Sequence, residues 1–364
     1  MIITIVAGAR PNFMKIAPII KAIQQAQKGG KNIVYRLVHT GQHYDKKMSS
    51  DFFEELGIPN PDINLECGGG SQAQQTAAIM IRFETELLKN RPTVVLVVGD
   101  VTSTMACTIT AKKLCIDVAH VEAGIRSGDM TMPEEINRIV TDAVCDHFFT
   151  TTEMANKQLE QNGIENSKIH FVGNTMIDTL FQNLDKLKKP ELWQEYKLEK
   201  NGFYLVTLHR PSNVDNPENL CRLIDIILKE TDDLPVIFPL HPRTRKNLST
   251  DYLNNSKLVA VEPMGYLEFI FLLKNSKAVI TDSGGITEEA TVLNIPCVTL
   301  RNSTERPETV TIGSNELAGI NPENLIPYLI KIKNNNWKKS SIPYLWDGKT
   351  STRIVEKLTE LYNC

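Results

Sequence analysis

The sequence predicts an α/β protein of two domains, each built around a doubly wound parallel sheet. Short apolar runs recur along the chain as buried strands, and an apolar-periodic helix follows most of them. Repeated strand–helix–strand units favour a parallel sheet with helices on both faces. A chain of 364 residues is long enough to form two such domains, each with its own core.

The first domain is predicted to span residues 1–173. Its expected strands are 2–6, 33–38, 93–98, 118–121, 147–150 and 170–172. Its expected helices are 13–26, 44–56, 72–88, 102–114, 133–145 and 153–162. Ser71 has the side chain of a helix N-cap for 72–88. One more helix is expected within 174–187, after a boundary near Gly173.

The second domain is predicted to span residues 174–350. A charged stretch without strand character leads into a new series of strands, expected at 203–208, 236–240, 258–261, 278–281 and 296–300. The last helix, within 351–364, is expected to pack back on the first domain.

Composition excludes several classes of function. The chain is 41% apolar and 23% charged with a net charge of −3, so it has no global basic field to hold nucleic acid or an anionic membrane. No apolar run approaches the roughly 20 residues of a membrane-spanning helix. Seven cysteines without a CxxC pair are typical of a reduced, cytoplasmic protein.

The stretch 120–138, HVEAGIRSGDMTMPEEINR, has the composition of an active site. Glu122 comes just past a predicted strand, where open α/β sheets collect ligand-binding groups. Pro133 suits the first position of a helix, and Glu134 follows in its first turn, four residues before Arg138. The alternative for PEEINR is a well-capped helix with a surface ion pair.

Further polar residues follow other predicted strands. Asp100 in VVGDVTST comes after the most apolar strand, although it could simply cap the next helix. His209 and His241 each follow a strand of the second domain beside arginines, in HRPSN and HPRTR. A single histidine is more often structural, but two His-Arg strand ends in one domain indicate an anion site.

The segment TDSGGITEEA, residues 281–290, has the form of a phosphate-binding turn. Ser283, Gly284 and Gly285 lie between a strand and a helix, where backbone N–H groups and the helix N-terminus favour a diphosphate. Glu289 comes a turn later and could accept hydrogen bonds from ribose hydroxyls; the alternative is a favourable first-turn charge. The segment is neither a nucleophile elbow nor a GxGxxG fingerprint, so NAD is not expected.

Two other segments are not expected to bind phosphate or metal. The glycine run 68–70 lacks the Gly-Lys-Ser or Gly-Lys-Thr of a P-loop and can be a flexible connector. HTGQH, residues 39–43, has the spacing of a metal pair, but the intervening Gly41 and the absence of HExxH favour a loop. No metal site and no cofactor are predicted.

Taken together, the motifs closely resemble those of the non-hydrolysing UDP-N-acetylglucosamine 2-epimerases over almost the whole chain. They occur in the order GARPNFMK, HTGQHYD, GDVTST, HVEAGIRS, PEEINR, VGNTMID, HRPSN, HPRTR, TDSGGITEEA and TERPE. Each is weak alone, but ten in series are specific. The resemblance implies the GT-B architecture, in which two Rossmann-like domains face each other across a cleft that holds the active site.

The resemblance also implies roles for residues. It makes Asp100, Glu122 and Glu134 the catalytic carboxylates and His209 an essential histidine. It places six further residues at UDP- or substrate-contacting positions: Arg10, Lys15, Ser283, Gly284, Glu289 and Arg306. Arg138, His241 and Gly285 complete the predicted substrate-binding set.

Two segments depart from the family pattern. Ser212 precedes Asn213 where many relatives have His-Arg-x-Glu-Asn, so a polar partner for this loop is lost. Gln42-His43-Tyr44 only partly matches the segment beside which some bacterial members bind an activating UDP-sugar.

The implied reaction is reversible inversion at C2 between UDP-GlcNAc and UDP-ManNAc, a step that supplies surface-polysaccharide precursors. We expect elimination of UDP to give a 2-acetamidoglucal, followed by its re-addition, with a UDP-sugar substrate and a homodimer. Alternatives are an epimerase for a related UDP-2-acetamido sugar, a GT-B glycosyltransferase and a catalytically silent UDP-sugar sensor. The grouping of three acids in the first domain favours an epimerase.

Overall fold

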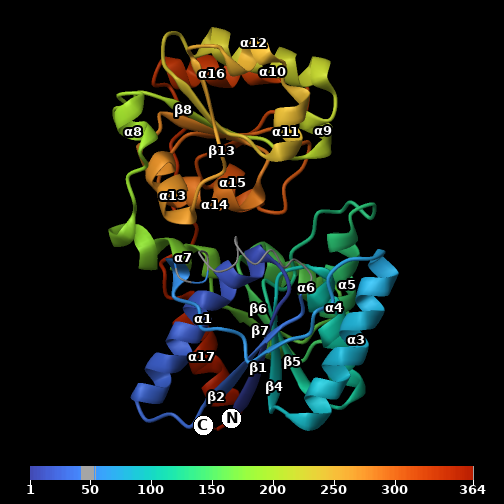
Figure 1. The fold of residues 1–364 in the computed structure, drawn as a ribbon. Coiled ribbons are helices and arrows are strands. Elements are labelled where there is room, and N and C mark those ends of the chain that lie inside the picture. The colour runs from blue at the N-terminus through green and yellow to red at the C-terminus, as the bar shows by residue number, and fades with distance from the viewer. Residues whose placement is uncertain (42–52, 54, 364) are drawn as a thin grey trace. The chain divides into compact units, whose positions relative to one another are not determined.

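The computed structural model describes residues 1–41, 53 and 55–363, and the chain divides into two compact units (Figure 1). Unit 1 consists of Met1–Gln182 and Tyr344–Cys364, and unit 2 of Asn183–Pro343. The division falls after Gln182 rather than near Gly173, because most of helix α7 (Thr175–Asn183) belongs to unit 1. The Thr179 hydroxyl on this helix donates to the Met14 carbonyl at 2.6 Å, which ties α7 to helix α1.

The sheet of unit 1 has seven strands in the order β3-β2-β1-β4-β5-β6-β7, and all are paired in parallel. The strands are β1 (Ile2–Ala7), β2 (Val34–His39), β3 (Ile63–Asn64), β4 (Val94–Val98), β5 (Asp117–Val121), β6 (His147–Thr150) and β7 (Ile169–Phe171). The short β3 was not predicted, because two residues carry no pattern. The neighbours of β1 run in opposite sequence directions, which is the doubly wound topology.

Helices cover both faces of this sheet. They are α1 (Arg10–Lys28), α3 (Gln72–Lys89), α4 (Thr102–Lys113), α5 (Pro133–Val144), α6 (Glu153–Gln161), α7 and α17 (Thr350–Leu361), with a 3-10 turn at Asn166–Lys168. In Figure 1, α1 and α17 lie side by side on one face and α3, α4 and α5 on the other. Ser71 caps α3, since its hydroxyl accepts from the Gln74 N–H. The helix expected at 44–56 falls mostly outside the described residues.

The C-terminal helix α17 is fixed to unit 1 by a buried carboxylate. Asp178 on α7 accepts the backbone N–H groups of Thr350 (3.0 Å) and Ser351 (2.6 Å), which are orphan donors of the first turn of α17. At the other end, the Tyr362 hydroxyl donates to Asp117 at 2.9 Å. The chain therefore returns to the first unit after completing the second.

The sheet of unit 2 has six parallel strands in the order β10-β9-β8-β11-β12-β13. They are β8 (Tyr204–Thr207), β9 (Val236–Pro239), β10 (Leu258–Val261), β11 (Ala278–Thr281), β12 (Cys297–Thr299) and β13 (Asn315–Leu317). The edge strand β13 was not predicted. The predicted fold class is confirmed: each unit is a doubly wound α/β domain.

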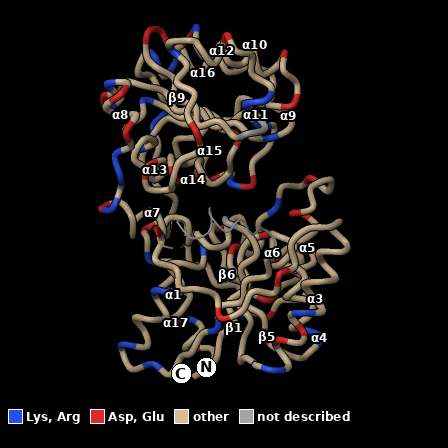
Figure 2. Tube along the Cα trace, viewed as in Figure 1, with Lys and Arg blue, Asp and Glu red and all other residues tan. Residues whose placement is uncertain are grey.

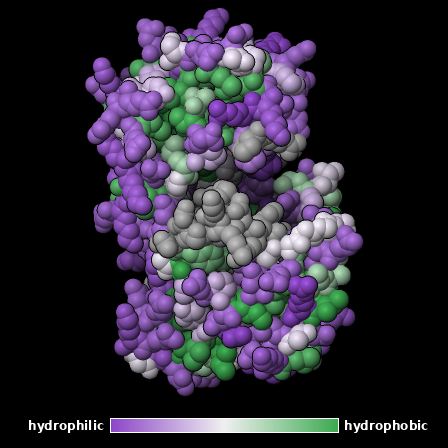
Figure 3. Space-filling model, viewed as in Figure 1, coloured by the Kyte–Doolittle hydropathy of each residue, from purple (hydrophilic) through white to green (hydrophobic). Residues whose placement is uncertain are grey.

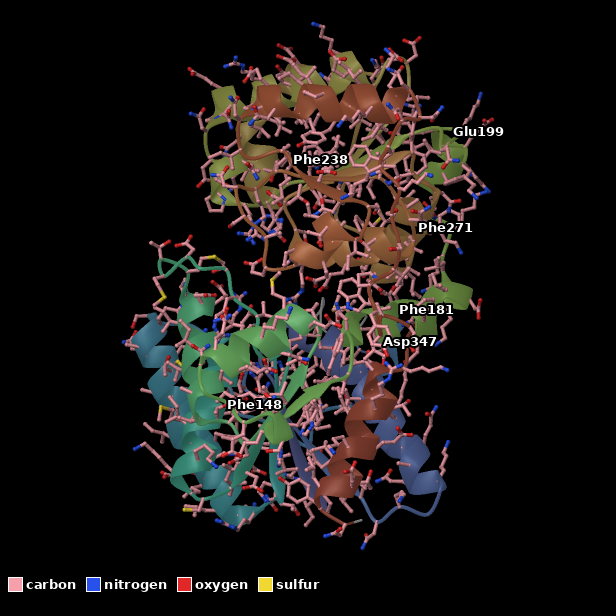
Figure 4. All side chains as sticks on the ribbon, turned by 180° about the vertical axis from the view of Figure 1, so that it is seen from behind. Phe148, Phe181, Glu199, Phe238, Phe271 and Asp347 are labelled. Atoms are coloured by element: carbon pink, nitrogen blue, oxygen red, sulfur yellow. The ribbon has the colours of Figure 1, made fainter. Side chains whose placement is uncertain are left out.

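The helices of unit 2 are short apart from α10. They are α8 (Leu192–Glu195), α9 (Pro211–Val214), α10 (Pro217–Glu230), α11 (Pro242–Asn247), α12 (Thr250–Leu253), α13 (Tyr266–Asn275), α14 (Gly284–Val292), α15 (Pro307–Thr311) and α16 (Ile326–Lys333), with 3-10 turns at Leu184–Lys186 and Pro322–Leu325. Each unit has its own core; Phe148 on β6 and Phe238 on β9 are fully buried in them (Figure 4).

Positions of both signs of charge occur along the whole chain. Figure 2 shows the Lys and Arg positions interspersed with the Asp and Glu positions along the trace of both units. Within the described ranges, no helix combines the length and the apolar character that crossing a bilayer requires.

Candidate active site

The predicted acids of unit 1 gather where the strand order reverses. The switch lies between β1 and β4, and ligands of open α/β sheets bind outside the carboxyl ends of strands at such a point. Lys15 lies on α1 after β1, Asp100 follows β4, and Glu122 follows the adjacent β5. The topology therefore brings these side chains to one edge of the sheet.

Asp100 is held by Arg138 of helix α5. The guanidinium donates from Nε (3.1 Å) and Nη2 (2.5 Å) to Oδ2 of Asp100, and the Asn137 amide donates to the Asp100 carbonyl at 2.8 Å. Arg138 is buried, whereas the Asp100 side chain keeps 29% of its surface exposed. Arg138, predicted from its spacing to pair with Glu134, thus orients Asp100 instead.

The buried partner of Arg138 within α5 is Glu135, not Glu134. Glu135 accepts from Arg138 Nη1 at 2.9 Å and from the backbone N–H groups of Ser127 (2.8 Å) and Gly128 (3.1 Å). Burial alone would raise the pKa of Glu135, but the hydrogen bonds from Ser127, Arg138 and Gly128 outweigh it and hold the pKa below its ordinary value. Glu134 is only half-buried. Glu135 therefore stabilises the 127–128 loop, and Glu134 is the more accessible carboxylate.

Glu122 combines burial, an ion pair and an unusual backbone. Lys15 Nζ donates to Glu122 Oε2 at 2.7 Å, and both side chains are largely buried. The φ of Glu122 is +70°, a left-handed conformation that costs a residue with a Cβ about 1 kcal/mol or more. Such strain persists where the surrounding structure enforces it, and functional sites are frequent among these places.

Lys15 also lies against the turn that carries Asp100. A Cβ added to Gly99 would be 2.9 Å from Lys15 Nζ, and the φ of Gly99 is +65°, so this position favours glycine. One ammonium group therefore contacts Glu122 and lies next to the residue that precedes Asp100.

Asn12 fixes the loop that leads into α1. Its Oδ1 accepts the N–H groups of Gly8 (3.1 Å) and Ala9 (3.0 Å), and its Nδ2 donates to the Val98 carbonyl at 3.0 Å. Asn12 thereby joins the ends of β1 and β4 at the switch point. Asn12 belongs to the motif GARPNFMK, but the sequence alone did not predict its role.

Unit 2 repeats the arrangement at its own switch point, between β8 and β11. His209 follows β8 and Asp282 follows β11, and His209 Nδ1 lies 2.8 Å from Asp282 Oδ1. Asp282 is fully buried, whereas the His209 side chain is 52% exposed. Asp282 also accepts from the Arg210 N–H (2.9 Å) and from Asn213 Nδ2 (3.0 Å).

The hydrogen bonds around Asp282 decide its charge. Burial would raise its pKa, but His209, Asn213 and the Arg210 N–H together hold the pKa of Asp282 below its ordinary value. Asp282 is therefore a carboxylate, and it organises the loop that carries His209. The sequence analysis assigned no role to Asp282, although this residue lies in the segment TDSGGITEEA, directly before Ser283.

The predicted phosphate-binding turn opens helix α14. Ser283 occupies the N-cap position of this helix, and its backbone N–H donates to Thr281 Oγ1 at 3.0 Å. A Cβ added to Gly284 would find its nearest neighbour, Arg301 Nη1, only at 3.9 Å, so there is open space over the turn. Gly285 is the next residue of the same helix.

Arginines with carboxylate partners lie near this helix. Arg306 forms an ion pair with Glu288 of α14, and Arg301 forms a two-point pair with Glu305 at 2.8 and 2.9 Å. The exposed fraction of the Arg306 side chain is 11%. Arg306 thus contacts helix α14, the helix that the glycine turn opens.

Glu289 of this helix is a buried carboxyl whose pKa is raised. Burial raises its pKa to about 8, the charge of Glu288 adds to the rise, and a hydrogen bond from Tyr266 opposes it. Sequence reasoning predicted a carboxylate that accepts ribose hydroxyls. In the structure the side chain is buried, and its raised pKa favours the protonated form below about pH 8.

The remaining predicted residues are placed only in part. The exposed His241 follows β9 at the carboxyl edge of the unit 2 sheet. The side chain of Arg10 and the segment Gln42-His43-Tyr44 lie outside the described part of the structure. Among the described residues, no group of three or more His, Cys, Asp or Glu side chains could hold a metal ion.

Comparisons with known proteins agree on one family. The model of the UDP-N-acetylglucosamine 2-epimerase family matches residues 25–359. A UDP-N-acetylglucosamine 2-epimerase from Methanocaldococcus jannaschii is 44% identical, with 99% of each chain covered. A UDP-2,3-diacetamido-2,3-dideoxy-D-glucuronate 2-epimerase from Pseudomonas aeruginosa is 40% identical, with 99% of each chain covered.

The fold gives the same answer as the sequence. The crystal structure of a Methanocaldococcus jannaschii UDP-GlcNAc 2-epimerase with UDP-GlcNAc and UDP has a TM-score of 0.86, with 99% of this chain and 100% of that chain covered. The two parallel sheets, of seven and six strands, match this GT-B-type fold. The chain belongs to the UDP-N-acetylglucosamine 2-epimerase family.

Proposed function

We propose that this protein interconverts UDP-GlcNAc and UDP-ManNAc by inverting the configuration at C2 of the sugar. The observation that carries the proposal is the pair of acids at the switch point of unit 1. Asp100 is oriented by Arg138, and Glu122 is oriented by Lys15. The similar epimerase from Methanocaldococcus jannaschii, solved with UDP-GlcNAc and UDP, supports the same substrate.

The chemistry requires more than one proton-transfer group. C2 has no neighbouring carbonyl, so loss of its proton alone has no stabilised product. When a carboxylate of unit 1 removes that proton, the C2–H electron pair forms the C1=C2 bond and the C1–O pair leaves with UDP. The resulting 2-acetamidoglucal then takes a proton at C2 on the other face, and UDP adds back at C1. Asp100, Glu122 and Glu134 are the candidates for the two transfers.

The departing diphosphate requires positive potential. In unit 2, the open turn at Ser283 and Gly284 exposes the first N–H groups of α14, which suit a phosphate. His209, held by Asp282, and Arg306, beside Glu288, add donors near that helix. We therefore assign UDP binding chiefly to unit 2 and proton transfer to unit 1.

A second substrate deserves a direct comparison, because the relative from Pseudomonas aeruginosa is almost as similar to the chain. That enzyme carries the name of a 2-epimerase of a diacetamido uronate nucleotide. Inversion at C2 by UDP elimination serves both sugars equally. The alternative of a glycosyltransferase is weaker, because a transferase does not need several acids placed for proton transfer at one carbon.

We further propose that the protein is a homodimer that works in the cytoplasm. Helix α5 exposes an apolar stripe on its outer face, formed by Ile136, Ile139 and Val144. Ile81 and Leu88 on α3 of the same unit are exposed too, and Figure 3 shows hydrophobic side chains at the surface over α3. Such a surface is typical of an interface, and a second copy is the partner that it fits.

The described cysteines are all free, as in a reducing compartment.

The experiment that tests the proposed reaction is incubation with each UDP-sugar alone, followed by NMR at the anomeric proton. Epimerisation of UDP-GlcNAc gives a second anomeric signal and an equilibrium mixture approached from either side. If only the diacetamido uronate nucleotide is converted, that compound is the substrate, and the proposed inversion at C2 still holds. Release of free sugar, or no change with either compound, would contradict the proposal.

A further inference from the structure

A buried pair, Asp142 and His120, lies directly beneath the two acids at the switch point of unit 1. His120 is fully buried on β5, and its Nδ1 lies 2.7 Å from Asp142 Oδ1. Asp142, itself buried on α5, uses its second oxygen to accept the Gly124 N–H at 3.0 Å and Arg126 Nη1 at 2.6 Å. Neither His120 nor Asp142 has a place in the chemistry described above.

The contacts of Asp142 surround Glu122. His120 precedes Glu122 by two residues and Gly124 follows it by two, and one carboxylate binds both. Glu122 has a left-handed φ of +70°, and Gly124, two residues later, has a φ of +78°. A Cβ added to Gly124 would lie only 2.4 Å from the Ala155 carbonyl oxygen. Asp142 therefore closes a short ring around the strained residue and holds it in that conformation.

The other side of the His120 ring reaches the turn of Asp100. His120 Nε2 lies 2.9 Å from the carbonyl oxygen of Gly99, the residue before Asp100. The link runs across neighbouring strands, alongside the hydrogen bond from the Gly99 N–H to the Val121 carbonyl at 3.0 Å. One imidazole thus spans the end of β4 and the end of β5.

Both ring nitrogens of His120 have a close oxygen partner. Nε2 faces the Gly99 carbonyl, which can only accept a hydrogen bond, and Nδ1 faces the carboxyl group of Asp142. Burial would raise the pKa of Asp142, but His120 and Arg126 hold it below its ordinary value. The ring is therefore held at both nitrogens, by one partner on each side.

We propose that the Asp142–His120 pair is a positioning device that fixes Glu122 relative to Asp100, so that two proton-transfer groups face one carbon at a set separation. This inference rests on the proposed function. A displacement of about 1 Å between a reacting atom and its catalytic group can lower the rate of a reaction about 10²-fold. A rigid link between the ends of β4 and β5 would keep both acids in the positions that proton transfer requires.

Two variants separate the halves of the link. His120→Asn retains a donor at the place of Nδ1, toward Asp142, and loses the donor to Gly99. His120→Gln retains a donor at the place of Nε2, toward Gly99, and loses the donor to Asp142. We expect each to lower kcat about 10-fold or more with KM changed less than about 3-fold, because substrate binding does not use the pair. His170→Asn, a half-buried histidine on β7 of the same unit, is the control and should leave kcat unchanged.

The isotope effect distinguishes positioning from a general loss of structure. With UDP-GlcNAc carrying deuterium at C2, the effect on kcat should be larger in both His120 variants than in the wild type, because misplaced acids make proton transfer more rate-limiting. A mere loss of folded enzyme lowers kcat and leaves the isotope effect unchanged. Variants with wild-type kcat and a wild-type isotope effect would overturn the proposal. A wild type that epimerises neither UDP-sugar would instead defeat the proposed function.

The wild-type protein supplies a measurement that needs neither substrate nor a folded variant. In ¹⁵N-histidine-labelled protein, we expect one imidazole whose ring N–H is protected from exchange with solvent, as a fully buried ring hydrogen-bonded to Gly99 and Asp142 requires. The His170→Asn control retains this signal. If no imidazole N–H is protected, the link from Gly99 to Asp142 does not exist and the positioning proposal falls, whatever the activity of the enzyme.

Discussion

His209 Nδ1 lies 2.8 Å from Asp282 Oδ1, so a fully buried carboxylate at the end of β11 orients a half-exposed imidazole at the end of β8. The same carboxylate accepts the backbone N–H groups of His209 and Arg210. Because Nδ1 is occupied, the other ring nitrogen is the one presented to a ligand. The pair therefore defines both where His209 lies and which atom it offers.

Replacement of Asp282 by asparagine should weaken UDP binding. The amide has one acceptor oxygen, and its NH₂ group would face N–H donors. We expect about a 10-fold higher Kd for UDP by calorimetry and a loss of about 1–3 kcal/mol in the free energy of unfolding. Ser212→Ala, at an exposed position of the same loop, is the matched control. An Asp282→Asn protein that binds UDP as tightly as the wild type would show that the pair does not organise the site.

Glu134 and Glu135 are neighbours with different roles, so their glutamine variants should differ in kind. Glu135→Gln exchanges an acceptor for a donor among the N–H groups of Ser127, Gly128 and Arg138, and should destabilise the fold by about 1–3 kcal/mol. Glu134→Gln should leave the Tm unchanged and lower turnover about 10²-fold if Glu134 transfers a proton. Paired measurements of Tm and kcat check both. If Glu134→Gln turns over normally, Glu134 is not a proton-transfer group and its catalytic assignment falls.

Glu289 should make stability depend on pH. Its pKa is about 8 in the folded protein against an ordinary 4.5, so between these values the folded state retains a proton that the unfolded state has released. The free energy of unfolding should therefore fall as pH rises through this window, by about 1 kcal/mol per pH unit from this group. Glu289→Gln, which mimics the protonated form, should flatten that slope in denaturant titrations from pH 5 to 8. The exposed Glu199→Gln serves as the control, and equal slopes for wild type and Glu289→Gln would exclude a buried neutral carboxyl.

The homodimer proposal predicts a charge-sensitive helix face. Ile139→Glu places a charge in the exposed stripe of α5 and should convert a dimer to a monomer in light scattering, with the folded unit retained by circular dichroism. Ile342→Glu, at another exposed isoleucine, should leave the mass unchanged. A wild type of monomer mass at micromolar concentration would contradict the proposal outright.

The comparison of sequence with structure shows which features local patterns can predict. Continuous apolar strands such as β4 and capped helices such as α3 were predicted to within a few residues, because burial and capping leave local signals. The short edge strands β3 and β13 carry no such signal. Asp282 and Asp142 were missed for another reason. Their partners lie 73 and 22 residues away in the chain, and nothing local distinguishes a buried carboxylate from a helix cap. The predicted partner of Arg138 within its helix, Glu134, was wrong. Glu134 and Glu135 lie four and three residues before Arg138, both spacings allow a side-chain pair on a helix, and only the packing of the helix decides between them.

The last prediction concerns the bonds that break. When the reaction runs in D₂O, removal of the C2 proton by one group and return by another should place solvent deuterium at C2 of the product, as read by NMR. A hydride held on a bound cofactor would return without exchange. Elimination also breaks the C1–O bond, so ¹⁸O that bridges C1 and the β-phosphorus should move into non-bridging positions if the bound diphosphate rotates. Absence of this scrambling is compatible with a phosphate clamped at Ser283 and Gly284, so the decisive observation is at C2. Product that forms in D₂O with its protium fully retained would rule out the elimination, and the roles of Asp100, Glu122 and Glu134 would fall with it.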